Sequence, residues 1–328
     1  MPPNTTQQGM QPTSPALPPL RTHGSIALLD DNADFVSMLE TLLDGGDYRL
    51  FSFSEPAPLH AFLAARAHLL QQEQALLSGI WRAQVETLGT SAVEALQFFA
   101  RPERLELPLV LVSDYAMPTE TGLSVCARHR YAGFERILLT GVADTHVAVS
   151  AFNAGLIEQF VRKQSPSVAQ DITSALQGRL QASAERRGAQ LATTWAAEFA
   201  GALCDPIAQG KLLALLAARD VREHIVLGDP QGILGITSHG EALWIQLETE
   251  ASLEDMDDLL QFAGVDGESS GRVAARNTLV AADFMQQIGL RPTEATAVVL
   301  SNAPLFIAAV HPLAVDHDLL PAVPAARN

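Results

Sequence analysis

The chain has 328 residues, enough for about two domains of ordinary size. Its formal net charge of −16 argues against a general nucleic-acid binder, because affinity for DNA depends largely on neutralising phosphates. Cys126 and Cys204 lie far apart in the sequence and do not have the spacing of metal ligands. No stretch reaches the ~20 continuous apolar residues of a membrane helix. We therefore expect a cytoplasmic protein with protein partners and no membrane or nucleic-acid partner.

The first half of the chain alternates short apolar runs with helical patterns. Residues 1–23 are rich in Pro, Gln, Ser and Thr and are expected to form a disordered tail. From residue 24, "SIALL", "YRLFSFS", "LPLVLVSD", "RILLTG" and "EQFVRK" are typical of strands, and the segments between them have helical spacing. Two consecutive helices are expected over about 58–100. Repeated strand–helix units predict an α/β fold with a doubly wound, five-stranded parallel sheet and a helical insertion.

Polar residues follow four of these strands. Asp30 and Asp31 follow the first, Asp114 ends the third, Thr140 ends the fourth and Lys163 follows the fifth. The carboxyl ends of parallel strands share one rim of a sheet, where ligands bind in folds of this class. Three carboxylates there repel one another unless a hard cation lies among them, and Mg²⁺ suits such ligands. A carboxylate, a cation, a lysine and a hydroxyl together are what an aspartyl-phosphate site requires.

Residues 24–166 resemble the CheY-like receiver domain of bacterial two-component response regulators, which has a flavodoxin-like fold. The motifs that carry the resemblance are "LLDDN", "VSDYAMPTETG", "ILLTG" and "FVRK", in this order. The resemblance implies phosphorylation by a cognate histidine kinase. It also implies a phosphoacceptor, Asp114; an Mg²⁺ site of Asp30, Asp31, Asp114 and the backbone carbonyl of Ala116; and a switch group of Thr140, Lys163 and Phe160.

The chain departs from the receiver pattern in two places. The interval between Asp31 and Asp114 is about twice that usual in the family, and the excess falls in the helical insertion. Gln164 stands after Lys163 where the family typically has a proline. A receiver that acts only as a phosphate sink is therefore an alternative.

Each rim residue also has a structural interpretation when taken alone. Asp30 or Asp31 could cap the helix that follows, and Asp114 could belong to a turn. The hydroxyl of Thr140 could be satisfied by backbone, and Lys163 could be a solvated surface charge. Their joint placement at successive strand ends favours the phosphoacceptor interpretation. The histidines are expected to be surface or lightly packed residues without a metal site; those considered are His60, His68, His129, His146, His224, His239, His311 and His317.

The insertion has more apolar positions than one stripe against the sheet would use. They include Leu69, Leu70, Leu76, Leu77, Ile80, Trp81, Val85 and Leu88. A second contact would cover the excess, either within the insertion or with another subunit in a homodimer.

Residues 167–204 predict a linker helix region with a break near Gly188, and residues 205–328 predict an α+β domain with an antiparallel sheet. The expected strands lie in "HIVLGD", "ILGITSHGEALWIQLET", "TAVVLS" and "LFIAAVHPL", and the expected helices over "SLEDMDDLLQFAGV", capped by Ser252, and about 281–288. The opening hairpin resembles that of PAS-type sensor domains. Residues 201–328 contain seven Lys or Arg and 17 Asp or Glu, which argues against a DNA-binding output. We expect a non-enzymatic output through a protein partner; the alternative is an unrecognised enzymatic or small-ligand-sensing domain.

Overall fold

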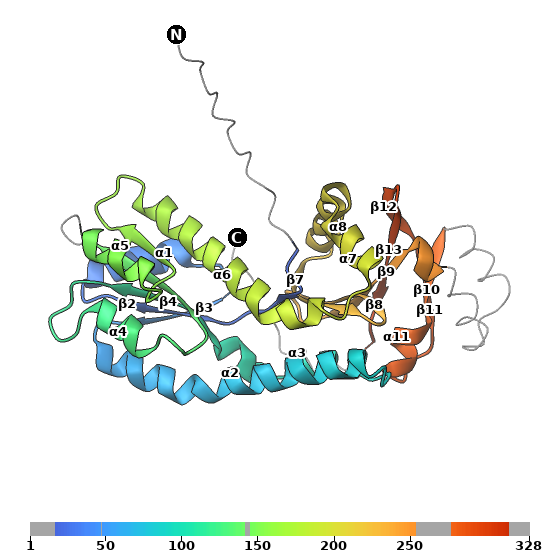
Figure 1. The fold of residues 1–328 in the computed structure, drawn as a ribbon, viewed down its shortest axis with the longest axis horizontal. Coiled ribbons are helices and arrows are strands. Elements are labelled where there is room, and N and C mark those ends of the chain that lie inside the picture. The colour runs from blue at the N-terminus through green and yellow to red at the C-terminus, as the bar shows by residue number, and fades with distance from the viewer. Residues whose placement is uncertain (1–16, 47, 142–144, 254–276, 315–328) are drawn as a thin grey trace, which may run out of the picture.

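Two sheets lie end to end in an elongated molecule, and long helices run from one to the other (Figure 1). The structure is a computed structural model that describes residues 17–46, 48–141, 145–253 and 277–314. Helices α2 (Pro56–Val85) and α6 (Val168–Ala192) contact strands of both sheets or the helices packed on them. The two halves of the chain are therefore joined by extensive packing as well as by the covalent linker.

The first sheet is parallel and five-stranded, in the order β3-β2-β4-β5-β6. Its strands are β2 (Ser25–Leu29), β3 (Arg49–Phe53), β4 (Pro108–Asp114), β5 (Glu135–Thr140) and β6 (Gln159–Arg162). Every residue of β2, β4 and β5 is buried, as expected for strands covered on both faces. The predicted doubly wound fold is confirmed.

Helices cover both faces of this sheet. On one face α1 (Ala33–Leu43) and α6 pack against a core that includes Ile26, Val110 and Ile137. On the other face the first half of α2, α4 (Gly122–Arg128) and α5 (Thr145–Asn153) pack against Ala27, Leu111 and Leu138. Alternate residues of one strand serve opposite faces, which explains the unbroken apolar runs in the sequence.

The second sheet has six strands in the order β1-β7-β8-β9-β13-β12, and every neighbouring pair is antiparallel. The strands are β1 (Leu20–Arg21), β7 (Val221–Gly228), β8 (Gln231–Thr237), β9 (Ala242–Thr249), β12 (Val298–Asn302) and β13 (Leu305–Pro312). Helices α7 (Ala197–Cys204) and α8 (Pro206–Ala218) cover one face. The expected α+β architecture with an antiparallel sheet is confirmed.

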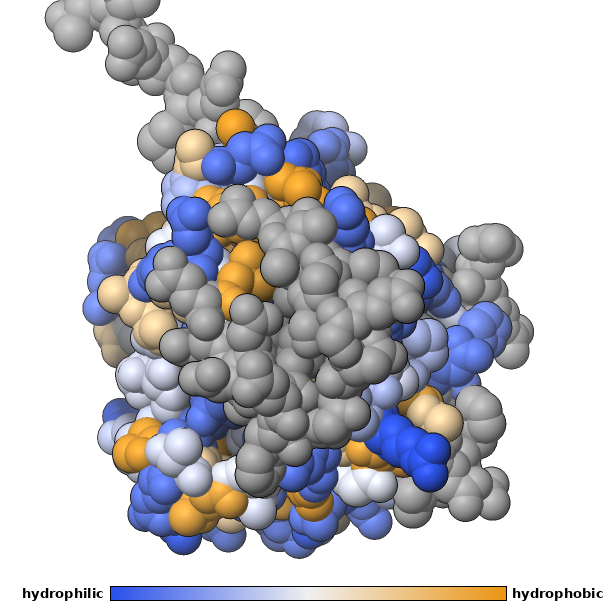
Figure 2. Space-filling view, turned by 90° about the vertical axis from the view of Figure 1, so that its right-hand side faces the viewer, coloured by the Kyte–Doolittle hydropathy of each residue, from blue (hydrophilic) through white to orange (hydrophobic). Residues whose placement is uncertain are grey.

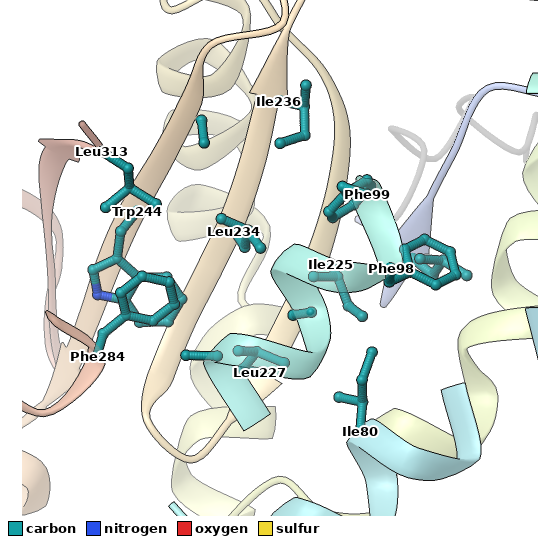
Figure 3. Packing of buried hydrophobic residues seen from close by; sticks show 14 of the residues in the cluster. Ile80, Phe98, Phe99, Ile225, Leu227, Leu234, Ile236, Trp244, Phe284 and Leu313 are labelled. Carbon is teal, nitrogen blue, oxygen red and sulfur yellow. The ribbon is translucent and has the colours of Figure 1, made fainter. Parts of the chain in front are cut away.

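The second face of this sheet is covered by the insertion. Helix α3 (Ser91–Phe99), the last turns of α2 and α11 (Ala282–Gln287) pack there on a core in which Trp244 stacks on Phe284 with ring centroids 4.0 Å apart (Figure 3). Leu69 packs in the core of the first sheet, whereas Ile80 packs in that of the second. The second contact of the insertion is therefore the other half of the same chain. The two expected alternatives, a contact within the insertion and one with another subunit, did not include this.

Two expectations about the segments that flank the receiver-like half were wrong. Part of the expected tail is structured, because Leu20 in β1 is fully buried and pairs with Ile225 of β7. The linker helix is not broken near Gly188, since α6 continues to Ala192. A β-carbon on Gly188 would lie 2.9 Å from the backbone nitrogen of Leu20, so this glycine allows β1 to approach α6 closely.

The remaining elements are small. A 3₁₀ helix, η1 (Pro102–Glu106), leads into β4, and β10 (Thr278–Ala281) pairs with β11 (Thr293–Thr296). The expected helix capped by Ser252 lies almost wholly outside the described residues. Within the described ranges no single helix is long and apolar enough to cross a bilayer, although the bent pair α7 and α8 passes that test together.

The end of the molecule that carries α11, β12 and β13 has a mixed surface (Figure 2). On its visible part, hydrophobic side chains form small separate groups among hydrophilic ones. Scattered exposed apolar residues of this kind are normal for a folded protein.

Candidate functional site

The carboxyl ends of four parallel strands bring the predicted residues to one rim. Asp30 directly follows β2, Asp114 is the last residue of β4, and Thr140 is the last residue of β5. Lys163 directly follows β6, and its backbone nitrogen donates to the carbonyl of Thr140 at 2.9 Å. The order of the strands thus gathers residues that are far apart in the sequence.

Lys163 bridges two carboxylates across this rim. Its Nζ lies 2.6 Å from Oδ2 of Asp30 and 2.9 Å from Oδ1 of Asp114. The ammonium also lies 4.7 Å from the ring centroid of Phe35, on α1, within the range of a cation–π contact. The side chain of Lys163 is 18% exposed, so its charge is paired in a partly desolvated site and is not a solvated surface charge.

Three carboxylates converge beside the lysine. Ligand oxygens of Asp30, Asp31 and Asp114 lie within 4.8 Å of one another. Asp30 and Asp114 are buried, whereas Asp31 is exposed. Burial raises the pKa of Asp30, and the negative charge of Asp114 adds to the rise, while Lys163 and the backbone N–H of Asn32 oppose it. The three carboxylates are hard oxygen donors, and the exposed one, Asp31, faces solvent. Such a site suits a cation that keeps part of its water shell.

The helix after β2 is capped by a different residue from those considered. Asn32 is the N-cap of α1, and its Oδ1 accepts a hydrogen bond from the backbone nitrogen of Phe35 at 3.1 Å. Asp30 instead accepts from the backbone nitrogen of Asn32 at 3.0 Å. The capping interpretation of Asp30 and Asp31 was therefore wrong, and their carboxylates belong to the rim.

Thr140 presents a hydroxyl without a partner. The residue is fully buried, and its Oγ1 makes no hydrogen bond to any residue that the structure describes. An unsatisfied buried hydroxyl costs free energy, so such a group is expected to have a partner in some state of the protein. The alternative interpretation, in which backbone satisfies this hydroxyl, was therefore wrong.

The turn after Asp114 depends on Gly122. A β-carbon at this position would lie 1.9 Å from the carbonyl oxygen of Asp114 and 2.5 Å from Oγ of Ser113. The start of α4 therefore packs directly against the end of β4, which only glycine permits. Within this turn Met117 is buried and Ala116 is exposed.

Phe160 lies in β6 beside Leu138 of β5. It is half-buried and packs at the border of the core that α2, α4 and α5 cover.

A cluster near the rim was missed in the sequence. Nδ1 of His60, on α2, lies 2.8 Å from Nε2 of His129, and Nε2 of His60 lies 3.0 Å from Oε2 of Glu120. Glu120 belongs to the turn between Asp114 and Gly122, so the cluster ties this turn to the insertion helix. Its residues are far apart in sequence, and no local pattern signals their approach.

The expectation for the histidines was wrong in part. His224 and His311 are 3% and 1% exposed, and both lie in strands of the second sheet. Burial lowers the pKa of each to about 4, which keeps both rings neutral. His317 lies outside the described residues.

The parallel sheet with this rim is the receiver fold of response regulators. The solved structure of the response regulator LqsR of Legionella pneumophila is similar over 94% of this chain and 94% of that chain, with a TM-score of 0.68 and 19% sequence identity. At this identity the likeness shows a shared fold, and it extends over both halves of the chain.

Shorter matches cover one half of the chain. A signal receiver domain of an HD domain-containing protein from Pseudomonas fluorescens covers 50% of this chain and 91% of its own, with 20% identity and a TM-score of 0.35. A response regulator receiver domain from Clostridium thermocellum covers 48% and 95%, with 18% identity and a TM-score of 0.30. No family model and no curated protein matches the sequence.

Proposed function

We propose that the chain is a phosphorelay response regulator that accepts a phosphoryl group on Asp114. The observation that carries the proposal is the contact of Lys163 Nζ with Oδ1 of Asp114, at 2.9 Å, on a rim that also holds two further carboxylates. A structural ion pair needs only one carboxylate for one lysine. Three carboxylates, one ammonium and an unpartnered hydroxyl suit the binding of a cation and an anionic group together.

Mg²⁺ fits the acidic cluster. Asp30, Asp31 and Asp114 would hold the ion, together with the backbone carbonyl of Ala116, and the exposure of Asp31 leaves room for bound waters. When bound, the ion would neutralise charge on the phosphoryl oxygens and lower the repulsion that an incoming phosphate meets. The chemistry of the donor set, all hard oxygens, favours Mg²⁺ over softer metals.

Each residue of the rim would have a distinct role in phosphoryl transfer. A carboxylate oxygen of Asp114 would attack the phosphorus of a phosphohistidine, forming an O–P bond as the N–P bond breaks and the imidazole leaves. Lys163, which now pairs with Asp30 and Asp114, would bind a phosphoryl oxygen. The free hydroxyl of Thr140 would donate to another, which supplies the partner that it lacks.

We further propose a cognate histidine kinase as donor and a protein partner as receiver of the signal. A shift of Thr140 toward the phosphoryl group would move β5 and the adjacent β6, which carries Phe160. The acidic second half of the chain supports an output through protein contacts and not through DNA.

Phosphoryl uptake can be measured by intact-mass spectrometry after incubation with acetyl phosphate, with and without MgCl₂. We expect the wild type to gain one phosphoryl group in a Mg²⁺-dependent manner and Asp114→Asn to gain none. Asp44→Asn is a matched control, because Asp44 is an exposed aspartate at the end of α1. Equal uptake by Asp114→Asn, or none by the wild type, would contradict the proposal.

A further inference from the structure

A cavity lined by both apolar and polar groups lies in the other half of the chain, away from the rim. It has a volume of about 220 Å³ and is bounded by the turn between β7 and β8, by β9 and β10, and by the start of α11. Trp244 and Phe284, which stack on each other in Figure 3, form an aromatic part of its wall. The cavity is smaller than the roughly 300–1,000 Å³ of sites for drug-sized ligands, so it suits a compact molecule.

One buried acceptor in the wall has no donor. Gln246 is 6% exposed, and its Nε2 donates to Oε1 of Glu248 at 2.7 Å and to the carbonyl of Val280 at 3.3 Å. Those two acceptors fix the orientation of the amide, because a flipped amide would set its oxygen against both. Oε1 of Gln246 is then left buried with no hydrogen bond to any residue in the described ranges.

All titratable side chains in the described lining of the cavity are carboxylic acids. Glu248, Asp229 and Asp283 line it, and none of its described lining residues is Lys, Arg or His. Burial, followed by the charge of Asp283, raises the pKa of Asp229 above its usual range. Oε1 of Gln231 is a further buried acceptor without a donor. The described part of the wall thus offers hydrogen-bond acceptors and carboxyl groups, and it contributes no cationic side chain.

The three carboxylates of this cavity do not form a compact metal site. Among the described residues, only Asp30, Asp31 and Asp114 form a group of three whose ligand atoms lie within 4.8 Å of one another. Glu248, Asp229 and Asp283 do not converge in this way. A planar or branched cation with several N–H donors can reach separated acceptors, and an aromatic wall favours positive charge.

We propose that this cavity binds a small organic cation with several N–H donors, of the guanidinium or primary ammonium type. Gln246 and Glu248, both in β9, accept hydrogen bonds from the cation. Asp229, in the turn between β7 and β8, and Asp283, in α11, supply carboxyl groups that attract its charge. The site is separate from the rim and does not depend on phosphorylation of Asp114.

The wall of the cavity is held by the insertion helices. Oγ of Ser91, at the start of α3, donates to the carbonyl of Asp229 at 2.6 Å. Oε1 of Gln84, near the end of α2, accepts from the backbone nitrogen of Gly228 at 2.8 Å. A ligand that orders the turn between β7 and β8 therefore also stabilises the helices that run to the first sheet.

Binding can be measured by isothermal titration calorimetry with methylguanidinium chloride on the full chain. Methylurea, at the same concentration and with ionic strength matched by NaCl, is the neutral analogue of the same shape. We expect the wild type to bind methylguanidinium and not methylurea. At pH 8, above the pKa of about 7 that burial gives Glu248, the loss of its charge in Glu248→Gln should weaken binding by about 10- to 100-fold.

Two further variants keep the test decisive. Glu241→Gln is the matched control, because Glu241 is exposed and precedes the same strand, and it should bind like the wild type. Asp283→Asn changes a half-buried lining residue on a different element, so it should weaken binding independently of Glu248. Equal heats for methylguanidinium and methylurea, or unchanged affinity in Asp283→Asn and Glu248→Gln, would overturn the proposal.

Discussion

Arg104 and Glu223 form a buried ion pair at the junction of the two sheets, with Nη2 2.6 Å from Oε2. Glu223 has no exposed surface and lies in β7, whereas Arg104 comes from η1, which leads into the first sheet. The backbone nitrogen of His23 also donates to Glu223, at 2.7 Å. One carboxylate thus joins the N-terminal segment, the receiver fold and the second sheet.

We predict that Arg104→Met destabilises the protein by about 3–5 kcal/mol, because it leaves a buried carboxylate without its charged partner. Urea unfolding of the wild type and the variant measures the difference. The double variant Arg104→Met, Glu223→Gln should recover much of the loss, since it removes the uncompensated charge. Equal stability of wild type and Arg104→Met would show that the pair does not link the sheets.

The cost of Arg104→Met should depend on pH. Burial alone would raise the pKa of Glu223, but hydrogen bonds from His23 and the charge of Arg104 hold it below the ordinary value of 4.5. The ionised form therefore contributes stability above that value, and the contribution is lost as pH falls through the lowered pKa. We expect the difference in unfolding free energy between wild type and variant to be largest near neutral pH and to shrink in acid.

Gly122→Ala should disrupt the turn that follows Asp114, the proposed phosphoacceptor. The added carbon would meet backbone oxygen 1.9 Å away, so the end of β4 or the start of α4 must move. We expect a lower melting temperature and a loss of phosphoryl uptake. Gly178→Ala in α6 is the control: nothing lies within 4 Å of its new carbon, and alanine should stabilise this helix by about 0.5–1 kcal/mol.

Thr140→Val should have opposite effects on the free protein and on the phosphoryl-bound state that we propose. In the free protein the change removes an unsatisfied buried hydroxyl, so the free energy of unfolding should rise by about 1 kcal/mol. With Mg²⁺ and beryllium fluoride, a stand-in for the phosphoryl group, the variant should gain less thermal stability than the wild type.

The hydroxyl of Thr173 offers a control for this experiment, because it already donates to the carbonyl of Ala169 at 2.9 Å. Thr173→Val should therefore leave the response to beryllium fluoride unchanged. A response of Thr140→Val equal to that of the wild type would mean that this hydroxyl does not contact the phosphoryl group.

Glu248 should make the second half of the chain less stable as pH rises. Burial raises its pKa to about 7, from an ordinary value of 4.5. The native state then holds a proton that the unfolded chain has lost, so stability should fall between these two values, by at most ~1.4 kcal/mol per pH unit. Glu248→Gln removes this dependence and should be more stable than the wild type above neutral pH. Parallel stability–pH curves for the two proteins would contradict the prediction.

The receiver half was predictable from the sequence because its information is local. Buried runs such as "LVLV" predict strands, and Asp30, Asp114, Thr140 and Lys163 could be placed because the ends of parallel strands share a rim. At Gly122 the sequence indicated only a turn. It did not indicate the close approach of α4 to the end of β4, because that contact depends on the tertiary fold.

The packing between the two halves was not predictable, because it depends on contacts between segments that are far apart in the sequence. Helical spacing reveals that Leu77 and Ile80 form an apolar stripe, but it does not name the surface that covers the stripe. Strand β1 has only two residues and is stabilised by pairing with β7. Gln246 and Glu248 lie on alternate positions of β9, a pattern that usually marks the solvent face of a strand, although both are buried. The resemblance of the second half to PAS-type sensor domains is still a prediction.

The position of the phosphoryl group tests the central claim most directly. The protein would be incubated with acetyl phosphate and Mg²⁺ and reduced with sodium borohydride, which converts an aspartyl phosphate to homoserine, and the modified residue would be located by tandem mass spectrometry. We predict homoserine at position 114 and unmodified aspartate at positions 30 and 31. Homoserine at another carboxylate, or at none under conditions that modify an ordinary receiver, would contradict the assignment of Asp114 as the phosphoacceptor.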